Sequence, residues 1–405
     1  MTEKLIATHK IIDAVDQIII DTGTYQAIDL LLHYNFLSYG HYEQWRTGKI
    51  QYLCNVLDNQ NSDAIFHCLE QAEHYVKSLN MIPEKITFQS WQAHTNSPLF
   101  LCLNNDYFSD LLSYHYLRQN SDDQMDLFFD NQALATSKEL KQALIDRNIK
   151  IANQKLQELY NIDPHNTILD GARELLDHLV NAIEEEEIED IKAELSYLLN
   201  ELSPLAQSIL SAQKRDYLSF FWYRLARQID DSFYDETEPH LHSAFCFAQI
   251  PDWPASIDRF EAMPKLKQQA ELFKQYLISL NKHEKQSKYI PFVCQFFWQF
   301  PDNDPDIFMH QDPSLKTLWQ HFLDDKEEHT QWTNEIFPSW LLISNLGMSH
   351  YSYADKNAPE DFLLLQKLIL SELQEKIPNI NLRKQVNAHS CALLDYYLKH
   401  SATNV

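Results

Sequence analysis

Glycine is almost absent from this chain, whose 405 residues contain only five of them. Phosphate-binding loops, dinucleotide turns and nucleophile elbows need closely spaced glycines, because only glycine lets the backbone approach a ligand or take a positive φ at little steric cost. No two of the five lie closer than eight positions: Gly23, Gly40, Gly48, Gly171 and Gly347. The sequence therefore excludes enzymes that depend on the G-x-G-x-x-G, G-x-x-x-x-G-K-[ST] or G-x-S-x-G motifs.

Basic residues are also scarce, since 33 Lys and Arg stand against 58 Asp and Glu, a formal net charge of −25. A charge of this sign repels nucleic-acid phosphate and anionic lipid, and it favours a partner with a basic face. No apolar run approaches the roughly 18 residues that a membrane span requires. The N-terminal residues 1–4 show no signal peptide. We therefore expect a cytoplasmic protein with no membrane span that does not bind nucleic acid.

The six cysteines form no C-x-x-C pair, and their spacing matches no zinc or redox motif. Most of them lie among apolar residues, as Cys294 does between Phe292 and Phe296. Buried, reduced thiols are the usual state of such cysteines in a cytosolic protein. The sequence thus predicts no disulfide and no cofactor.

Apolar residues recur at helical spacing along most of the chain. Leu169, Ala172, Leu176, Leu179 and Ile183 step by three and four, which is typical of an amphipathic helix. The same stepping resumes at 188–202 in a shifted register, so either one helix carries a register break at 184–187 or two helices meet there. Ser137 is a good N-cap, and we predict a helix from there to about Tyr160.

Helical patterns and scarce glycine together predict an all-α protein. We expect an N-terminal helical domain over residues 1–118, an acidic linker or loop over 119–136, and stacked antiparallel helix pairs over 137–400. Asp21-Thr22-Gly23-Thr24 resembles both the active-site turn of aspartic proteases and a phosphate loop of actin-like ATPases. Neither a second catalytic aspartate pattern nor further glycine-rich loops accompany it, so we interpret Gly23 as the C-cap of a helix.

One segment has the pattern of a known repeat. Ala244, Phe247, Trp253, Ser256 and Phe260 follow a small, aromatic, turn-aromatic, small, aromatic order within residues 240–264. This segment resembles part of a tetratricopeptide repeat. The resemblance implies an α-solenoid of stacked helix pairs, whose exposed surface binds another protein.

Aromatic residues and arginine gather at residues 220–224, a combination typical of interface hot spots. The candidate partner-binding residues are Phe221, Trp222, Arg224 and Trp253. The alternative is that the cluster forms a core between helices. On a helix, Phe220, Tyr223 and Arg227 would share a different face from Phe221, Arg224 and Gln228.

A second candidate site joins histidines with acids. Alternate histidines can share a metal ion that carboxylates complete, and the residues concerned are His240, His242, Glu236 and Glu238. The competing interpretation is a capped helix start with surface histidines, because Pro239 indicates a turn and residues two apart diverge on a helix.

These observations favour a non-enzymatic role over a catalytic one. We expect a cytoplasmic scaffold or adaptor that binds another protein, and the acidic charge of the chain favours a partner with a basic face. Two alternatives stay open. One is a metal-dependent hydrolase that uses the His240 and His242 cluster. The other is an acidic mimic that sequesters a basic partner.

Overall fold

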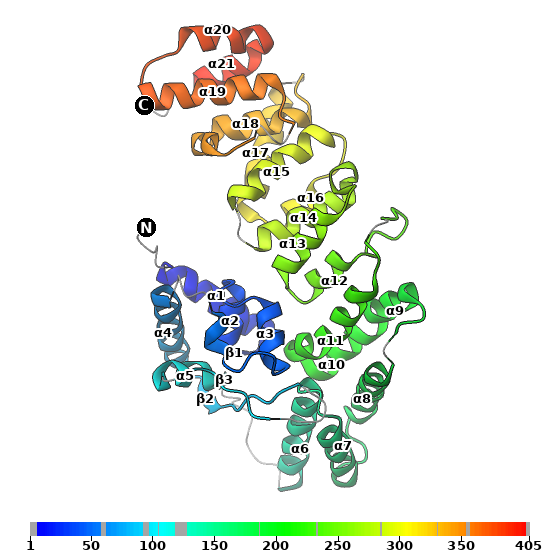
Figure 1. Cartoon of the computed structure of the whole chain (residues 1–405). Helices are drawn as coiled ribbons and strands as arrows, with labels where there is room; N and C mark the ends of the chain where they lie inside the picture. The colour runs from blue at the N-terminus through cyan, green and yellow to red at the C-terminus, as the bar shows by residue number, and fades with distance from the viewer. Residues whose placement is uncertain are drawn as a thin grey trace. The chain divides into compact units, whose positions relative to one another are not determined.

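The computed structural model describes residues 6–57, 62–91, 97–103, 105–117, 128–185, 187–231, 234–283, 286–329, 331–353 and 357–401. Contacts within the chain define two compact units, Met1–Ser256 (unit 1) and Ile257–Val405 (unit 2). Both are mainly helical, and the strands of the described residues all lie in unit 1, so the predicted all-α class is confirmed (Figure 1). Residues 119–127 of the predicted linker lie outside the described residues. Residues 128–136 belong to a helix, and the predicted domain boundaries stay a prediction.

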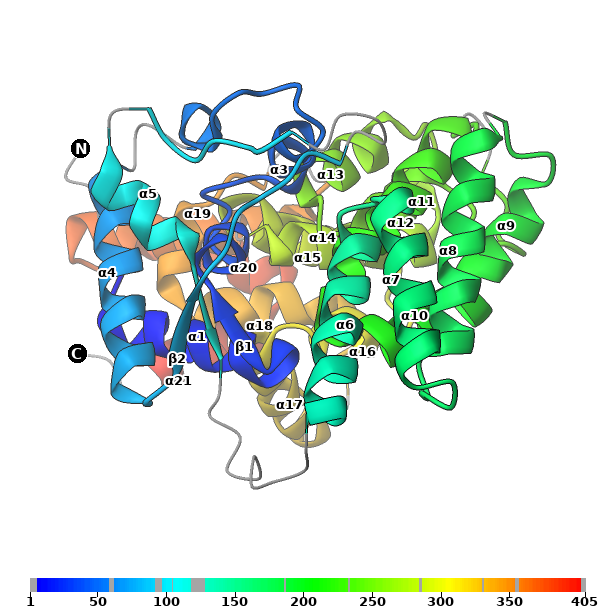
Figure 2. The same ribbon diagram turned by 90° about the horizontal axis from the view of Figure 1, so that it is seen from below.

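Unit 1 begins with helices around a small sheet and continues with helices alone. In Figures 1 and 2, α6, α7 and α8 lie side by side. Its elements are α1 (Thr8–Thr22), β1 (Thr24–Gln26), α2 (Ala27–His33), α3 (Tyr39–Arg46), η1 (Leu53–Val56), α4 (Ser62–Ser78), β2 (Ile82–Lys85), α5 (Asp106–Ser113), β3 (Tyr114–Leu117), α6 (Phe128–Ile145), α7 (Ile149–Ile162), α8 (Leu169–Glu184), α9 (Ile191–Tyr197), η3 (Leu198–Leu202), α10 (Ser203–Leu210), η4 (Ser211–Gln213), α11 (Lys214–Gln228), α12 (Ser243–Gln249) and the first residues of α13 (Trp253–Ala262).

The sheet is antiparallel, with strand order β1-β3-β2, and Tyr25 of β1 pairs with Tyr116 of β3. Gly23 ends α1 just before β1. Its φ is 74°, a left-handed conformation that glycine adopts without a Cβ clash, and its N–H donates to the Ile19 carbonyl at 2.8 Å. The interpretation of Asp21-Thr22-Gly23 as a helix end is therefore confirmed.

The predicted helix from Ser137 to Tyr160 is wrong in two respects. Ser137 is not its N-cap, because α6 begins at Phe128 and contains Ser137, and the structure divides the predicted helix into α6 and α7. Arg147 has a positive φ of 55°, which ends α6. The Asn148 side chain then accepts a hydrogen bond from the Ile151 N–H at 3.1 Å and begins α7. Asparagine is a strong N-cap, but this sequence signal is short and lies inside a continuous helical pattern.

Two helices occupy the region of the predicted register break, because α8 ends at Glu184 and α9 begins at Ile191. The alternative of two helices is therefore correct, and that of one continuous helix is not.

Gly171 lies where α8 contacts α10. A Cβ there would come within 2.7 Å of Ile209 Cδ1. Absence of a side chain thus lets these two helices approach closely.

Unit 2 has an aromatic core. Phe296 of α15 packs on Phe308 of α16 with ring centroids 5.1 Å apart, and Phe297 packs on Phe337 of α18 at 4.7 Å. Beyond the rest of α13, the elements are η5 (Leu266–Gln268), α14 (Ala270–Lys282), α15 (Gln286–Gln299), α16 (Asp306–Met309), α17 (Pro313–Glu328), η6 (Asn334–Ile336), α18 (Phe337–Ser344), η7 (Leu346–His350), α19 (Glu360–Glu375), α20 (Ile380–His389) and α21 (Cys391–Ser401).

A polar side chain lies within this apolar core. Gln295 is 0% exposed, and neither its Oε1 nor its Nε2 has a hydrogen-bond partner among the described residues. We expect Gln295→Met to raise the free energy of unfolding by about 1–3 kcal/mol, because a buried amide without partners costs that much. Thermal unfolding measures the change. Gln320→Met, on the exposed side of α17, is the matched control, and a lower melting temperature for Gln295→Met alone would contradict the prediction.

Glu372 of α19 holds α20 and α21 in place. Arg383 donates to its two carboxylate oxygens at 2.7 and 2.9 Å, and the Tyr397 hydroxyl and the Asn379 N–H also donate to them. Burial raises the pKa of Glu372, but these hydrogen bonds outweigh burial and hold the pKa below its ordinary value of 4.5. The ionised carboxylate therefore stabilises the fold above pH 4.5, and this stabilisation is lost as the pH falls through the lowered pKa.

Glu372→Gln is accordingly expected to destabilise the protein by about 1–3 kcal/mol at pH 7. The difference from the natural protein should shrink progressively below pH 4.5, because the natural carboxyl group then becomes neutral as well. Melting temperatures of both proteins across pH 3–7 measure this. A difference that is constant over the whole range would rule out the charge as the cause.

Candidate binding site

A pocket of about 640 Å³ lies within unit 1. This volume falls within the range of small-ligand sites. The pocket is bordered by α3 and the turn after it, by the α6–α7 turn, by one face of α11 and by the residues around the start of α13. Trp91, in the segment between β2 and α5, also lines it.

One face of α11 forms a wall of the pocket. Phe220, Tyr223, Arg224 and Arg227 line it at positions i, i+3, i+4 and i+7, which project from the same side of a helix. Phe220 and Tyr223 are half-buried, whereas Arg227 is exposed. The sequence had indicated a face formed by Phe220, Tyr223 and Arg227, but not that this face borders a cavity.

Only one of the four predicted partner-binding residues lines the pocket. Phe221 and Trp222 are 3% and 2% exposed and belong to the core of unit 1, so their rings offer no surface to a partner. Arg224 lines the pocket, and Trp253 is half-buried at the start of α13. The core interpretation of the aromatic cluster thus describes Phe221 and Trp222 correctly.

Two buried ion pairs join α3 to the α6–α7 turn. Arg46 bonds to Asp146, and Arg147 donates to Glu43 at 3.0 Å. Arg46 and Arg147 are 3% and 4% exposed. Burial raises the pKa of Asp146, and the adjacent Arg46 only partly offsets this effect. The turn between α6 and α7 therefore places Asp146 and Arg147 next to residues of opposite charge on α3.

Asp216 of α11 extends this network. Tyr39 and Tyr42 of α3 donate to its carboxylate at 3.1 and 2.8 Å. Burial raises the pKa of Asp216, but neighbouring guanidinium groups and the Tyr42 hydroxyl outweigh burial and hold the pKa below its ordinary value of 3.8. Arg147 also donates to the Ser219 hydroxyl at 2.7 Å. Together these bonds fix the pocket wall of α3 relative to that of α11.

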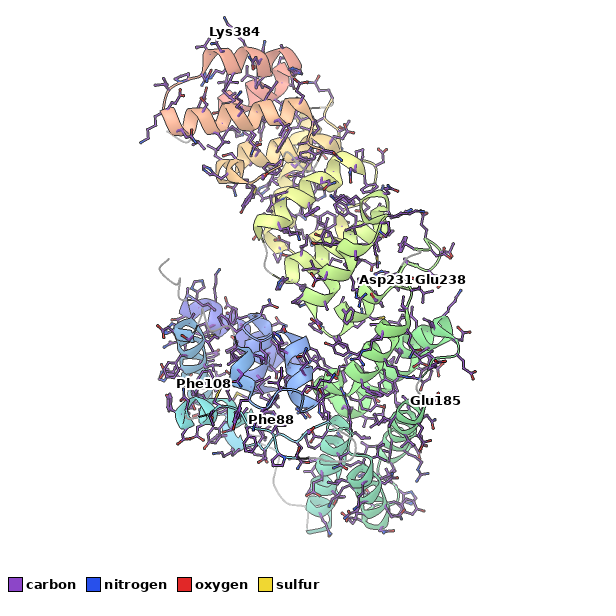
Figure 3. All side chains as sticks on the ribbon, in the orientation of Figure 1. Phe88, Phe108, Glu185, Asp231, Glu238 and Lys384 are labelled. Carbon is purple, nitrogen blue, oxygen red and sulfur yellow. A yellow bond between two sulfur atoms is a disulfide. The ribbon has the colours of Figure 1, made fainter. Side chains whose placement is uncertain are left out.

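Trp91 lies between two guanidinium groups. The Cζ atoms of Arg46 and Arg147 are 4.3 and 4.0 Å from its ring centroid, and its backbone N–H donates to the Arg46 carbonyl at 2.6 Å. Cations stacked on an indole face are attracted to the ring quadrupole. Phe88, which is labelled in Figure 3, contacts the ring of Trp45, and their ring centroids lie 5.1 Å apart. Trp91 is thus held rigidly at the pocket.

A disulfide links Cys54 to Cys102, across 48 positions of sequence. The Leu53 and Cys54 N–H groups also donate to the Phe100 and Leu101 carbonyls, so residues 100–102 are anchored beside η1. The prediction that the cysteines are all reduced is wrong for this pair. Sequence spacing could not reveal it, because the two residues approach only through the fold.

Three buried N–H groups at the pocket lack an acceptor among the described residues. They are Trp91 Nε1, Arg147 Nε and Arg224 Nε. Trp91 and Arg147 are each 4% exposed. Because their side chains stack directly, two of these donors belong to groups in contact. Buried donors are normally satisfied, so these three N–H groups are among the exceptions in this protein.

Positive charge predominates at the pocket although the whole chain is strongly acidic. The lining contains Lys49, Arg147, Arg224 and Arg227, against Glu43 and Asp252. Glu43 binds Arg147, and Asp252 accepts a hydrogen bond from the Tyr223 hydroxyl at 2.7 Å. A further acid, Glu194, approaches Arg224 at 3.6 Å.

Lys49 and Arg227 differ from the other cations of the lining. Both are exposed, and neither forms an ion pair within the described ranges of the chain. The site therefore carries cations whose charge is not compensated, beside aromatic walls. Chemically, it suits an anion attached to an apolar or planar group.

The predicted metal residues have other roles. His242 accepts a hydrogen bond from the Phe245 N–H at 3.1 Å and caps α12, and the His240 ring stacks on Phe245 at 4.4 Å. Glu238 pairs with Lys192, and Glu236 is exposed. Among the residues that the structure describes, no three His, Cys, Asp or Glu residues lie close enough to hold a metal ion. The helix-capping interpretation thus describes His242.

The buried thiols are poor nucleophile candidates. Burial raises the pKa of Cys68 to about 12, and it raises those of Cys246 and Cys294 further. A thiol with a raised pKa carries little of the reactive thiolate at neutral pH. None of these cysteines lines the pocket.

No protein-family model matches this chain, and neither a curated protein nor a solved structure does. Within the described part of the chain, no helix has the length and apolar character needed to cross a membrane.

Proposed function

We propose that this chain is a non-catalytic adaptor that binds another protein, and that its partner docks at the pocket of unit 1. The observation that carries the proposal is the pair of uncompensated cations, Lys49 and Arg227, at a cavity with aromatic walls. Arginine and aromatic residues dominate the binding energy of protein interfaces. Stacked helix pairs of the tetratricopeptide type, which the segment 240–264 resembles, commonly serve such a role.

The charge of the pocket changes the kind of partner that we propose. Net charge alone favoured a partner with a basic face, but Lys49, Arg224 and Arg227 at one cavity favour an acidic segment there. The acidic remainder of the surface would repel a partner that is acidic throughout. The proposed partner therefore presents a local anionic group and is not a polyanion.

Site-specific cross-linking in the native cell tests this function. A photoreactive amino acid replaces Lys49 in one protein and Arg173, which is exposed on α8 outside the pocket, in the other. We expect one protein to be cross-linked from position 49 and not from position 173, and its yield to fall when Arg227→Glu is added. Equal cross-linking yields from positions 49 and 173, or a yield from position 49 that Arg227→Glu does not change, would reject docking at the pocket. A yield that Arg227→Glu does not change but that is lost at high salt would favour an acidic mimic instead.

A further inference from the structure

We propose that the Cys54–Cys102 disulfide is a reducible clamp, which orders one wall of the pocket of unit 1 when it is closed and loosens that wall when it is opened. The clamp joins η1, which follows α3, to a segment that we call the strap, residues 86–91 and 97–103. Control of docking by the clamp rests on the proposed function, since the pocket then receives the partner.

The strap packs against the C-terminal half of α3. The Phe88 ring contacts Trp45, whose indole N–H donates to the Phe100 carbonyl at 2.9 Å. The Trp91 backbone N–H donates to the Arg46 carbonyl at 2.6 Å. Because Trp91 lines the pocket, the strap contributes one residue to the same wall as α3 and the turn after it.

The end of the strap is held by the disulfide and by the hydrogen bonds beside it. The Leu53 and Cys54 N–H groups donate to the Phe100 and Leu101 carbonyls at 3.2 and 3.0 Å. The Phe100 side chain is 54% exposed, so this junction lies at the surface. Backbone hydrogen bonds at a surface open readily where few buried contacts support them. The covalent link therefore determines whether the strap and η1 stay together.

The two sulfur atoms are more accessible than the other thiols of the unit. Cys54 and Cys102 are half-buried, whereas Cys68 and Cys246 are buried. A thiolate from outside can approach a half-buried disulfide while the protein stays folded, and accessible disulfides are the labile, regulatory ones. The pair is thus suited to reversible reduction.

The reductant that we propose is a dithiol. Its first thiolate attacks one sulfur of the disulfide, forms a mixed disulfide and releases the other cysteine as a thiolate. Its second thiolate then attacks the mixed disulfide and releases the remaining cysteine. The dithiol leaves as a disulfide, and Cys54 and Cys102 keep the two electrons and take up two protons as thiols.

Reduction acts on the pocket through the residues that flank the clamp. Lys49 lies in the turn between α3 and η1, and Trp91 lies in the strap, and both line the pocket. A wall that moves must be ordered when a partner binds, and this ordering lowers the affinity. The closed clamp therefore favours docking, and the open clamp disfavours it.

Thiol labelling of the folded full chain tests whether the clamp opens. After treatment with dithiothreitol at a concentration that leaves the circular dichroism unchanged, we expect Cys54 and Cys102 to react with iodoacetamide, as peptide mapping detects. Without reductant they should not react. Cys391→Ser removes an exposed free thiol and is the matched control, which should leave the pair unchanged. Reduction only after unfolding, or free thiols at both positions without reductant, would overturn the proposal.

Hydrogen exchange measures what opening does to the wall. In the reduced protein, and in the double variant Cys54→Ser, Cys102→Ser, amides of residues 47–57 and of the strap should exchange about tenfold or more faster. Amides of unit 2, and those of Cys391→Ser, should exchange as before. Equal exchange in the oxidised and reduced states would overturn the clamp. Faster exchange throughout unit 1 would also overturn it, because the disulfide would then stabilise the whole unit.

Cross-linking from position 49, in a cell extract prepared without reductant, relates the clamp to the partner. The double variant Cys54→Ser, Cys102→Ser should lower the yield by about threefold or more, whereas Cys391→Ser should not. An unchanged yield would overturn control of docking by the clamp. If no protein is cross-linked from position 49 in any variant, the proposed function fails, and hydrogen exchange decides whether the clamp orders the wall.

Discussion

Asp146→Ala is expected to lower the free energy of unfolding by about 3–5 kcal/mol, because it leaves a buried guanidinium without its carboxylate. Arg46 is 3% exposed, so water cannot replace the missing partner. Its remaining side-chain bond, to the Tyr42 hydroxyl at 3.0 Å, does not neutralise the charge. The α3 helix would lose one of its two ionic contacts with the α6–α7 turn. Urea unfolding followed by circular dichroism measures the change.

The exposed ion pair between Lys85 and Asp110 provides the matched control. Its atoms are 2.9 Å apart, but the two side chains are 61% and 57% exposed. Asp110→Ala should therefore cost less than about 1 kcal/mol. Replacing both Arg46 and Asp146 with apolar residues of similar size should recover much of the stability lost in Asp146→Ala. Equal effects of Asp146→Ala and Asp110→Ala would contradict the role given to the buried pair.

Trp91→Ala is expected to lower the free energy of unfolding by about 3–5 kcal/mol, the usual cost of deleting a large buried aromatic side chain. The deletion empties the space between the Arg46 and Arg147 guanidinium groups and exposes both to the cavity. Thermal and urea unfolding of the full chain measure the effect. The pocket would also lose the Trp91 ring from its lining.

Trp91→Phe separates packing from hydrogen bonding. The indole N–H has no acceptor among the described residues, so its removal breaks no bond within the protein. We therefore expect Trp91→Phe, which keeps an aromatic ring but removes three ring atoms, to destabilise the protein clearly less than Trp91→Ala does. Equal losses of stability in the two variants would contradict this prediction.

Local signals in the sequence predicted much of the helical framework. Gly23 ends α1 as expected, since a left-handed C-cap depends on a single residue type. The three-and-four stepping of residues 169–183 corresponds to α8, because amphipathic spacing reflects which side of one helix is buried. On α11, the face shared by Phe220, Tyr223 and Arg227 was visible in the sequence for the same reason.

The candidate site could not be predicted in this way. Glu43 and Arg147 are 104 positions apart, and no local pattern relates them. Lys49 and Trp91 are also far apart in the sequence, and no local pattern places both at one pocket. Phe221 and Trp222 looked like surface anchors, because a sequence dense in aromatics does not reveal which face of a helix meets the core. The turn at Asp146–Asn148 was missed because its signal is confined to a few residues.

The sequence by itself determined that this chain is built mainly of helices, that Gly23 ends one of them, and that the closely spaced glycine motifs of nucleotide-binding and hydrolase sites are absent from it. These properties depend on residues close together along the chain, where backbone preferences and apolar spacing act. Only the tertiary structure decided that four cationic residues of an acidic protein line one cavity, and that Trp91 lies between two arginines there. Electrostatic and stacking contacts depend on distance in space, and the order of residues does not encode that distance locally.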